Sequence, residues 1–318
     1  MARASKITLA VVGYAVLAIC GITTAAAQCA GGGGGLDVSG TVSPALSSYN
    51  PFSTVPQSQV FSFTIVNSET TDCSVSIAFL RPGLPTMSKG GDTLGYDITS
   101  GGSNIVFSGS TPAPGNRVDL TIAGNNGSAV VTYRVEVEDG QAVSAGAYLD
   151  AGVSLEFFER DAGGTLTGTI KSIAASVSDT VASICDFPTP SVTSLNFTSR
   201  IVNAVPTSQP LVLEVPGVQC TTPAFIKLSG DAMRQNPSPS PLANFDHFIN
   251  YSAAATLGSA SVTLTTSEVA GSDTATSAGV TSGLANGAVD LSIGLVPGKP
   301  VQAGHYESIL TLEIIPEF

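Results

Sequence analysis

The sequence predicts an all-β protein built from two antiparallel β-sandwich domains, and three observations support this prediction. Short segments alternate between apolar and polar residues, as half-buried strands do, and Gly, Pro and Asn turns separate them. Charged residues make up only 11% of the 318-residue chain, so the Glu and Lys of long amphipathic helices are scarce. The chain also repeats itself once, over a length that suits domains rather than solenoid turns.

The first 27 residues are predicted to be a secretory signal peptide. Arg3 and Lys6 form a short positive region, residues 7–19 are apolar, and Ala25–Ala27 give a small-residue cleavage site before Gln28. The apolar stretch is short for a membrane span. We therefore expect an exported protein. Its formal net charge of −12 repels phosphate backbones, so nucleic acid is not expected as a partner.

The predicted strands follow one another along the whole chain. The glycine run 31–35 leads flexibly into a strand over residues 36–42. Apolar and polar residues alternate most clearly over residues 131–138 and 289–295. The last strand covers residues 308–315 and ends just before Phe318.

Four cysteines remain after signal removal, and an even number in an exported protein indicates two disulfides with three possible connectivities. They are Cys29, Cys73, Cys185 and Cys220. Close pairs of the kind that bind zinc are missing from this spacing, so no metal site is expected.

The internal repeat selects one connectivity. Cys73 and Cys220 are each followed by Gly ten residues later and then by Met, and the closing motif Val-x-Ala-Gly-x-Tyr occurs at 143–148 and 301–306. An apolar strand follows each closing motif, with Gly152 as one extra residue that a β-bulge could absorb. Each half then holds one early and one middle cysteine. We predict bridges Cys29–Cys73 and Cys185–Cys220, and domains at 28–184 and 185–318.

These residues carry a family resemblance. Each half resembles a spore coat protein U domain, the module of archaic chaperone–usher pili. The matching features are the cysteines at the domain starts, the Cys-x₉-Gly segments and the closing Ala-Gly-x-Tyr motifs, together with Tyr49-Asn50-Pro51, Tyr96 and Tyr251. The second half departs from the pattern because it lacks a clear Tyr-x-Pro segment.

The resemblance implies immunoglobulin-like sandwiches, of which a pilus subunit lacks the last strand until a neighbour donates it. The second domain would then be incomplete, with Leu310, Leu312 and Ile314 lining an acceptor groove. The first domain would be completed within the chain by residues 173–183, where Val177 and Val181 face the same side. With Cys29 as the second residue of the mature chain, no donor extension precedes it, which implies a subunit at the pilus tip.

The implied role is an adhesin that mediates surface attachment and biofilm formation, exported through the periplasm to the cell surface. Implied partners are a periplasmic chaperone, an outer-membrane usher, an adjacent pilus subunit and a host or abiotic surface. Candidate adhesive loops are Pro51-Phe52, Leu84-Pro85 and the turn around Leu166. The main alternative is a secreted structural coat protein assembled without an usher, and a free-standing soluble binding protein is the next.

An enzyme is not expected, and neither is a cofactor. His247 and His305 have no plausible catalytic partners in the sequence, and the glycine run lacks the Lys of a phosphate loop. Glu156, Glu159 and Asp161 could suggest paired carboxylates, but the sequence favours an ordinary solvated strand edge.

Overall fold

The computed structural model describes Cys29 and residues 35–187, 194–236, 240, 242–268, 273–281 and 285–317. The predicted signal peptide lies outside these residues. The predicted all-β fold class is confirmed, because the strands form several sheets and pair antiparallel almost throughout. The described helical elements are two 3-10 turns, η1 (Pro114–Asn116) and η2 (Thr198–Arg200). Within the described part of the chain, no helix is long and apolar enough to cross a membrane.

Two facing sheets form the first sandwich. The first sheet has the order β1 (Leu36–Gly40), β2 (Gln57–Asn67), β10 (Gly127–Val137), β6 (Asp97–Ser100) and β7 (Ser103–Asn104). The second has the order β5 (Asp92–Gly95), β4 (Thr86–Lys89), β11 (Gly146–Arg160), β3 (Cys73–Leu80) and β8 (Val106–Phe107), with β9 (Val118–Ile122) on β3 and β12 (Leu166–Val181) on β11. Large side chains fill the space between them, among them Phe63, Phe79, Tyr133, Tyr148 and Phe157.

The second sandwich repeats this plan. One sheet has the order β13 (Cys185–Asp186), β16 (Leu211–Cys220), β23 (Ala285–Leu295), β20 (Tyr251–Leu257) and β21 (Ala260–Thr265). Facing it are β22 (Asp273–Thr276), β17 (Ala224–Gly230) and β25 (Leu310–Pro316), and a further sheet of β19 (Phe248–Ile249), β18 (Met233–Gln235) and β24 (Tyr306–Glu307). The hairpin of β14 (Ile201–Val202) and β15 (Val205–Pro206) lies at one end.

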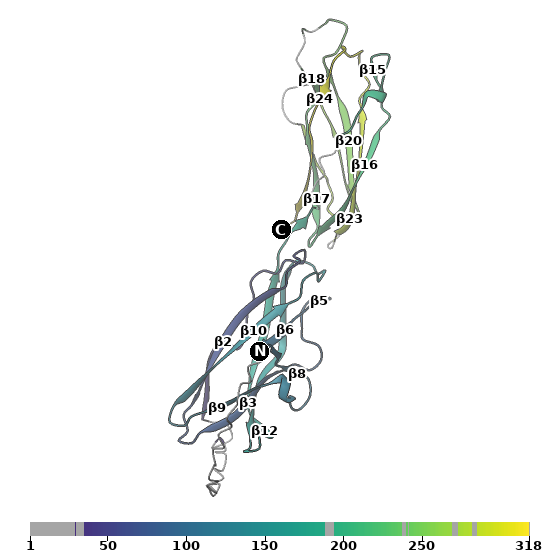
Figure 1. Ribbon diagram of the computed structural model, residues 1–318. Coiled ribbons are helices and arrows are strands. Elements are labelled where there is room, and N and C mark those ends of the chain that lie inside the picture. The colour runs from purple at the N-terminus through teal and green to yellow at the C-terminus, as the bar shows by residue number, and fades with distance from the viewer. Residues whose placement is uncertain are drawn as a thin grey trace, which may run out of the picture.

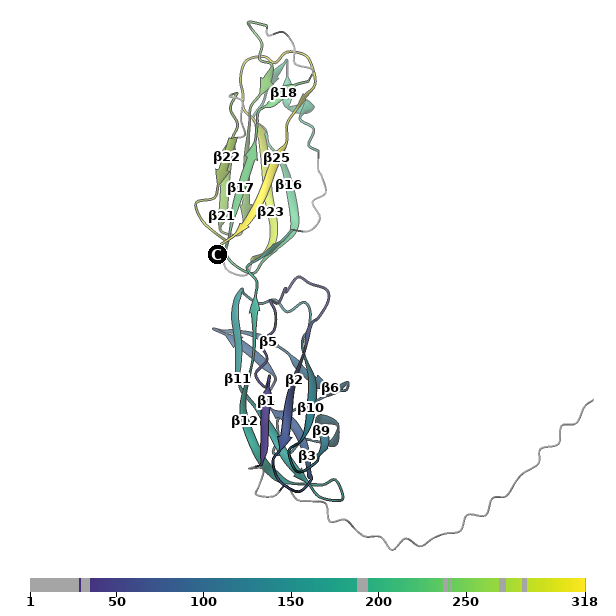
Figure 2. The same cartoon turned by 90° about the vertical axis from the view of Figure 1, so that its left-hand side faces the viewer.

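The two sandwiches lie end to end, and the chain passes between them once, after β12 (Figures 1 and 2). No ladder among the described residues joins a strand of β1–β12 to a strand of β13–β25. The carboxyl end of β25 lies beside the junction of the two sandwiches, and the β14–β15 hairpin lies at the opposite end of the second sandwich.

The sequence repeat corresponds to structurally equivalent strands. Met87 on β4 lies opposite Leu94 on β5, and Met233 on β18 lies opposite Ile249 on β19. The order β1-β2-β10-β6 is repeated as β13-β16-β23-β20, and β9-β3-β11 as β22-β17-β25. β12 alone among the long strands of the first sandwich has no counterpart in the described part of the second.

The closing Ala-Gly-x-Tyr motif builds the same corner in both sandwiches. The Tyr148 hydroxyl donates to the Ser144 carbonyl at 2.8 Å, and the Tyr306 hydroxyl donates to the Gln302 carbonyl at 2.7 Å. A tyrosine near the start of a strand whose hydroxyl bonds back to the backbone a few residues upstream fixes the corner that leads into that strand in immunoglobulin-like sandwiches. The repeated motif therefore positions the start of β11 and of β24.

The cysteines and glycines of the repeat are only partly equivalent in structure. Disulfides join Cys29 to Cys73 and Cys185 to Cys220, the pairs that the repeat predicts. Gly83 adopts a φ of 88° in an exposed turn, where a side chain would be strained. Gly230 instead ends β17, where a Cβ would lie 2.3 Å from the Tyr251 hydroxyl. The Cys-x₉-Gly spacing thus meets a different structural need in each half.

Candidate strand-acceptor groove

β12 closes the first sandwich along the outer edge of β11. The two strands pair from Gly146 opposite Val181 to Arg160 opposite Leu166. A register shift after Asp150 absorbs the extra residue Gly152, whose N–H donates to the Asp150 carboxylate at 2.9 Å. This is the β-bulge that the repeat predicts.

β12 also hydrogen-bonds on its other edge and fills the core. The N–H groups of Leu46 and Tyr49 donate to the carbonyls of Ser178 and Thr180, both at 2.8 Å. Val177 and Val181 are almost completely buried, at 0% and 2% exposure. The two valines of the predicted completing segment therefore face the core from a strand that is paired on both edges.

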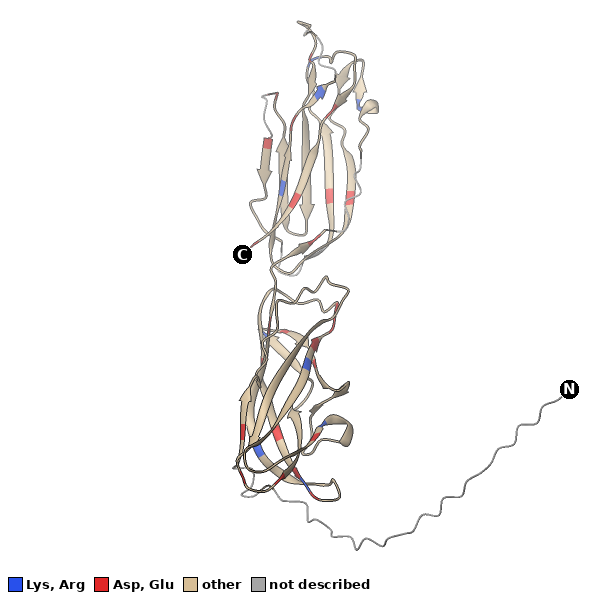
Figure 3. Ribbon diagram, turned by 60° about the vertical axis from the view of Figure 1, so that its left-hand side comes forward, with Lys and Arg blue, Asp and Glu red and all other residues tan. Residues whose placement is uncertain are grey.

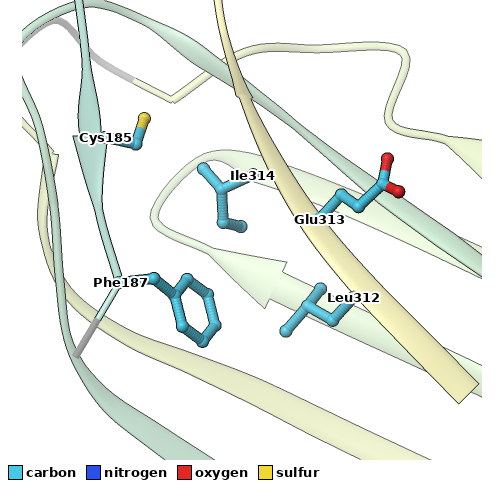
Figure 4. A pocket seen from close by; sticks show the side chains of 5 residues that line it. All are labelled: Cys185, Phe187, Leu312, Glu313 and Ile314. Atoms are coloured by element: carbon cyan, nitrogen blue, oxygen red, sulfur yellow. The ribbon is translucent and has the colours of Figure 1, made fainter. Parts of the chain in front are cut away.

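The second sandwich leaves the equivalent position open. β25 pairs with β17, from Ala224 opposite Pro316 to Gly230 opposite Leu310, and no described strand lies along its other edge. A groove with a volume of about 340 Å³ runs there. Its lining residues are Cys185, Phe187, Leu312, Glu313 and Ile314. In Figure 4 the side chains of Phe187, Leu312 and Ile314 point into the space, while Glu313 turns away.

The apolar side chains of β25 are less buried than those at the equivalent positions of the first sandwich. Their counterparts on β11 are Val153, Leu155 and Phe157, which are at most 3% exposed. Leu310, Leu312 and Ile314 pack on the second core but remain only half-buried. Full burial of such a side chain stabilises a protein by about 1.5–3 kcal/mol relative to exposure. The open groove therefore leaves part of this stabilisation unrealised.

The wall opposite β25 comes from the chain after the second domain's first cysteine. Phe187, Leu195 and Phe197 pack against the second core and are half-buried. The equivalent segment of the first sandwich bonds to β12, whereas residues 194–197 make no strand ladder among the described residues. This wall was not predicted from the sequence, although the spacing of Leu195 and Phe197 is that of one face of a strand.

Charges are sparse around the groove. Lys227 and Glu313 form an ion pair at 2.9 Å on the outer face of the sheet, with both side chains partly exposed. Figure 3 shows acidic and basic residues scattered singly over both sandwiches. The groove therefore combines an apolar floor with an edge of β25 along which no other described strand pairs. This arrangement can bind an extended strand through main-chain hydrogen bonds and alternate apolar side chains.

The candidate adhesive loops do not form one surface. Pro51 is buried and Phe52 half-buried, near the end of β12 that meets the second sandwich. Leu84 is 79% exposed, on the connection between β3 and β4, with Pro85 half-buried beside it. Leu166 lies at the opposite end of the first sandwich and packs against Phe158 and its neighbours.

The prediction that Glu156 lies on a solvated strand edge is wrong. This residue is 6% exposed, and its carboxylate accepts hydrogen bonds from the hydroxyls of Ser154 at 2.5 Å and Ser172 at 2.6 Å. The two hydroxyls replace the hydrogen bonds that water would donate, so the carboxylate can be buried on this face of the strand. Glu159 accepts the Cys29 N–H at 2.8 Å, and Asp161 caps a turn through the Thr165 N–H.

The histidines and possible metal ligands form no cluster. His305 is exposed, 3.7 Å from Glu307, and His247 packs edge-on against Phe248. In the described part of the chain, no group of three or more His, Cys, Asp or Glu side chains could hold a metal ion.

Comparison with known proteins finds similar folds. A complex of a chaperone with the tip adhesion subunit of archaic chaperone–usher Csu pili from Acinetobacter baumannii is 14% identical with a TM-score of 0.43, and the match covers 88% of this chain and all of that one. The CupB6 tip adhesin from Pseudomonas aeruginosa is 11% identical with a TM-score of 0.34, over 87% of this chain and 93% of that one. No protein-family model and no curated protein sequence matches the chain. At these identities the likeness concerns the fold only.

Proposed function

We propose that this chain is a pilus subunit whose second sandwich accepts a β-strand from a neighbouring subunit. The observation that supports this most directly is the unmatched strand. Every long strand of the first sandwich except β12 has a counterpart in the second, and the empty position is a groove with half-buried apolar residues. A donated strand would pair with the free edge of β25 and cover Leu310, Leu312 and Ile314.

In this proposal the two sandwiches have different roles. The first is completed by β12 of its own chain and carries the adhesive surface at the pilus tip, while the second, pilin-like, joins the fibre. A periplasmic chaperone would protect the groove after export, and an outer-membrane usher would mediate replacement by the adjacent subunit. The resulting function is attachment to a host or abiotic surface and biofilm formation. The spore-coat type of structural protein, assembled without an usher, is the alternative.

The test uses a peptide of residues 166–183, which are β12 and the start of the linker that follows it. β12 completes a sandwich of the same plan, so its peptide should bind the full chain at the groove. Binding to the native state raises the free energy of unfolding by about 2.7 kcal/mol at a ligand concentration of one hundred times Kd. The melting temperature of the second sandwich should therefore rise with peptide concentration, while that of the first stays constant.

Two matched controls define the groove as the binding site. A peptide with Val177→Asp and Val181→Asp should have no effect, because its core-facing positions are charged. In the protein, Leu312→Glu should abolish the response and Thr311→Glu, which changes an exposed position of the same strand, should preserve it. A chain that unfolds at the same temperature with and without the unaltered peptide would contradict the proposal and favour the coat-protein alternative.

A further inference from the structure

The junction between the two sandwiches shows how a strand donor is connected to the domain that follows it. β12 ends at Val181, three residues follow, and Cys185 begins the second sandwich. Thr221 of the second sandwich, which is 1% exposed, bonds to the linker between the two sandwiches. Its hydroxyl donates to the Ala182 carbonyl at 2.7 Å and accepts the Ile184 N–H at 2.9 Å. A strand that completes one sandwich is thus tied directly to the next sandwich.

The first sandwich contributes its closing motif to this junction. The Ala145 N–H donates to the Thr221 carbonyl at 2.8 Å, and Ala145 is only 8% exposed. Ala145 is the alanine of the first Ala-Gly-x-Tyr motif, at the end of the first sandwich where β12 exits. The second sandwich therefore covers the closing motif of the first.

The equivalent motif of the second sandwich is uncovered. Ala303 is exposed, and its N–H donates to no described residue. Exposed apolar residues lie near it: Val202, Leu242 and Phe245 are 53%, 51% and 40% exposed. Backbone hydrogen bonds link their segments to the motif, from Val301 to Ala204 at 2.7 Å and from Gln302 to Asp246 at 2.9 Å. We call Val202, Leu242, Phe245 and Ala303 the end face.

Strand polarity connects the end face to the groove. β25 runs toward the junction, because Pro316 lies opposite Ala224, three residues after Thr221, and the carboxyl terminus is beside the junction in Figures 1 and 2. A donor strand antiparallel to β25, as β12 is to β11, begins at the junction and leaves the groove at the end face. A parallel donor would instead direct its following chain into the first sandwich.

Given the proposed strand-acceptor function, we infer that the end face is a docking surface for the β-sandwich domain that follows the donated strand. This contact repeats the junction of this chain. In this chain the carbonyl of Thr221, next to the domain's second cysteine Cys220, accepts the Ala145 N–H. In the proposed contact, the equivalent carbonyl of the partner domain accepts the Ala303 N–H. The partner domain also covers Val202, Leu242 and Phe245. The partner is thus a domain with a short linker between its donor strand and its first cysteine.

The first test locates the exit of the strand. The chain contains no tryptophan, so Phe245→Trp places a single indole fluorophore on the end face, and Glu317→Trp places one at the junction end of β25. The 166–183 peptide carries a quencher at either its amino or its carboxyl end. The carboxyl-terminal quencher should reduce F245W emission by more than half and leave E317W bright, and the amino-terminal quencher should do the reverse. The opposite pattern would overturn the inference and leave strand binding intact.

The second test supplies a docking domain. Repeating residues 166–184 directly ahead of Cys29 in the full chain gives each molecule a donor strand followed by a sandwich. Sedimentation should show head-to-tail association, and Phe245→Glu should weaken it at least tenfold. Leu84→Glu, a change at an exposed leucine of the first sandwich, should leave it unchanged. The Phe245→Glu and Leu84→Glu variants should both bind the 166–183 peptide as tightly as the chain without either substitution.

The outcomes separate the two proposals. Equal association of the F245E and L84E chains would exclude the end face as the docking surface. Peptide binding without association of the extended chain would exclude it as well. Failure of the peptide to bind any variant would instead refute the strand-acceptor function on which the inference rests.

Discussion

The carboxylate of Asp179 is buried on β12 with incomplete hydrogen bonding. The residue is 3% exposed, and its Oδ1 accepts the Thr180 N–H at 2.6 Å. Its Oδ2 has no hydrogen-bond partner among the described residues, and neither does the buried Oε1 of the neighbouring Gln57. Burial raises the pKa of Asp179 to about 6 from an ordinary value of 3.8. The strand that closes the first sandwich therefore carries a carboxyl group that keeps its proton to a higher pH than an ordinary aspartate does.

This raised pKa predicts a pH-dependent stability of the first sandwich. The folded chain holds the Asp179 proton at pH values where the unfolded chain has lost it. The stabilisation from this proton is complete below pH 4 and disappears as the pH rises through 6. Asp179→Asn should remove the cost of the buried charge, because the amide is neutral and can donate to Gln57 Oε1.

The measurement is the thermal unfolding of the full chain between pH 4 and pH 8. At pH 7.5 Asp179→Asn should stabilise the first sandwich by up to about 3 kcal/mol, with the gain shrinking toward pH 4. Asp37→Asn, an exposed change on β1, should match the original chain at every pH. A stability difference between Asp179→Asn and the original chain that is the same from pH 4 to pH 8 would show that Asp179 does not titrate in this range.

At the scale of elements, the tyrosine corners explain why the Ala-Gly-x-Tyr motif is repeated. A hydrogen bond of this kind contributes about 0.5–1.5 kcal/mol net. Tyr306→Phe should destabilise the second sandwich by that amount and leave the first unchanged. Tyr148→Phe should cost the first sandwich at least as much, because Tyr148 is 1% exposed and its hydroxyl also approaches Asp92 at 3.3 Å.

Chemical denaturation that resolves the two sandwiches would check both values. If either substitution destabilised the other sandwich, or if both were neutral, the hydroxyl–carbonyl bonds would not be what fixes the two corners.

The strands were predictable from sequence where one face is buried and the other is in water. The alternation at residues 131–138 and 289–295 matches β10 and β23, because these strands each have one solvated face. The alternating pattern failed at Glu156, where β11 is covered on both faces and the charge is satisfied by the hydroxyls of Ser154 on the same strand and Ser172 on β12. The completing strand is also longer than residues 173–183, since β12 begins at Leu166 as the second arm of a hairpin with β11.

The groove shows a similar division between what sequence can and cannot reveal. Leu312 and Ile314 line it on β25 and were predictable because they repeat the spacing of an equivalent strand in the first half, whereas Leu310, predicted with them, is not among the lining residues. The contribution of Phe187 was not predictable, because Phe187 lies more than a hundred residues from β25 in the sequence. Sequence periodicity contains no information on which distant segments become neighbours. The end face has the same origin: Val202 on β14 and Leu242 and Ala303 on two separate connections are brought near one another only in the folded chain.

At the scale of the whole molecule, Thr221 connects the linker and the first sandwich to the second through its hydrogen bonds. Its hydroxyl satisfies both the Ala182 carbonyl and the Ile184 N–H of the linker, and its carbonyl satisfies Ala145. Thr221→Val keeps the shape of the side chain and removes the hydroxyl. Two partly buried linker groups then lose their partner, at a cost of about 1–3 kcal/mol each when they cannot reach water. The linker can avoid this cost by moving into solvent, so the junction should become mobile while each sandwich stays folded.

Pulsed electron paramagnetic resonance on the full chain can detect this mobility. Spin labels at Leu84 and Val212, which are 79% and 71% exposed, report the separation of the two sandwiches. The distance distribution should be narrow in the original chain and at least twice as wide after Thr221→Val. Thr263→Val, at an exposed position of β21, should keep it narrow. The Thr221 variant should still bind the 166–183 peptide, since the groove residues are unchanged. An equally narrow distribution in the Thr221 variant would mean that packing at the junction, rather than this hydroxyl, holds the sandwiches in line.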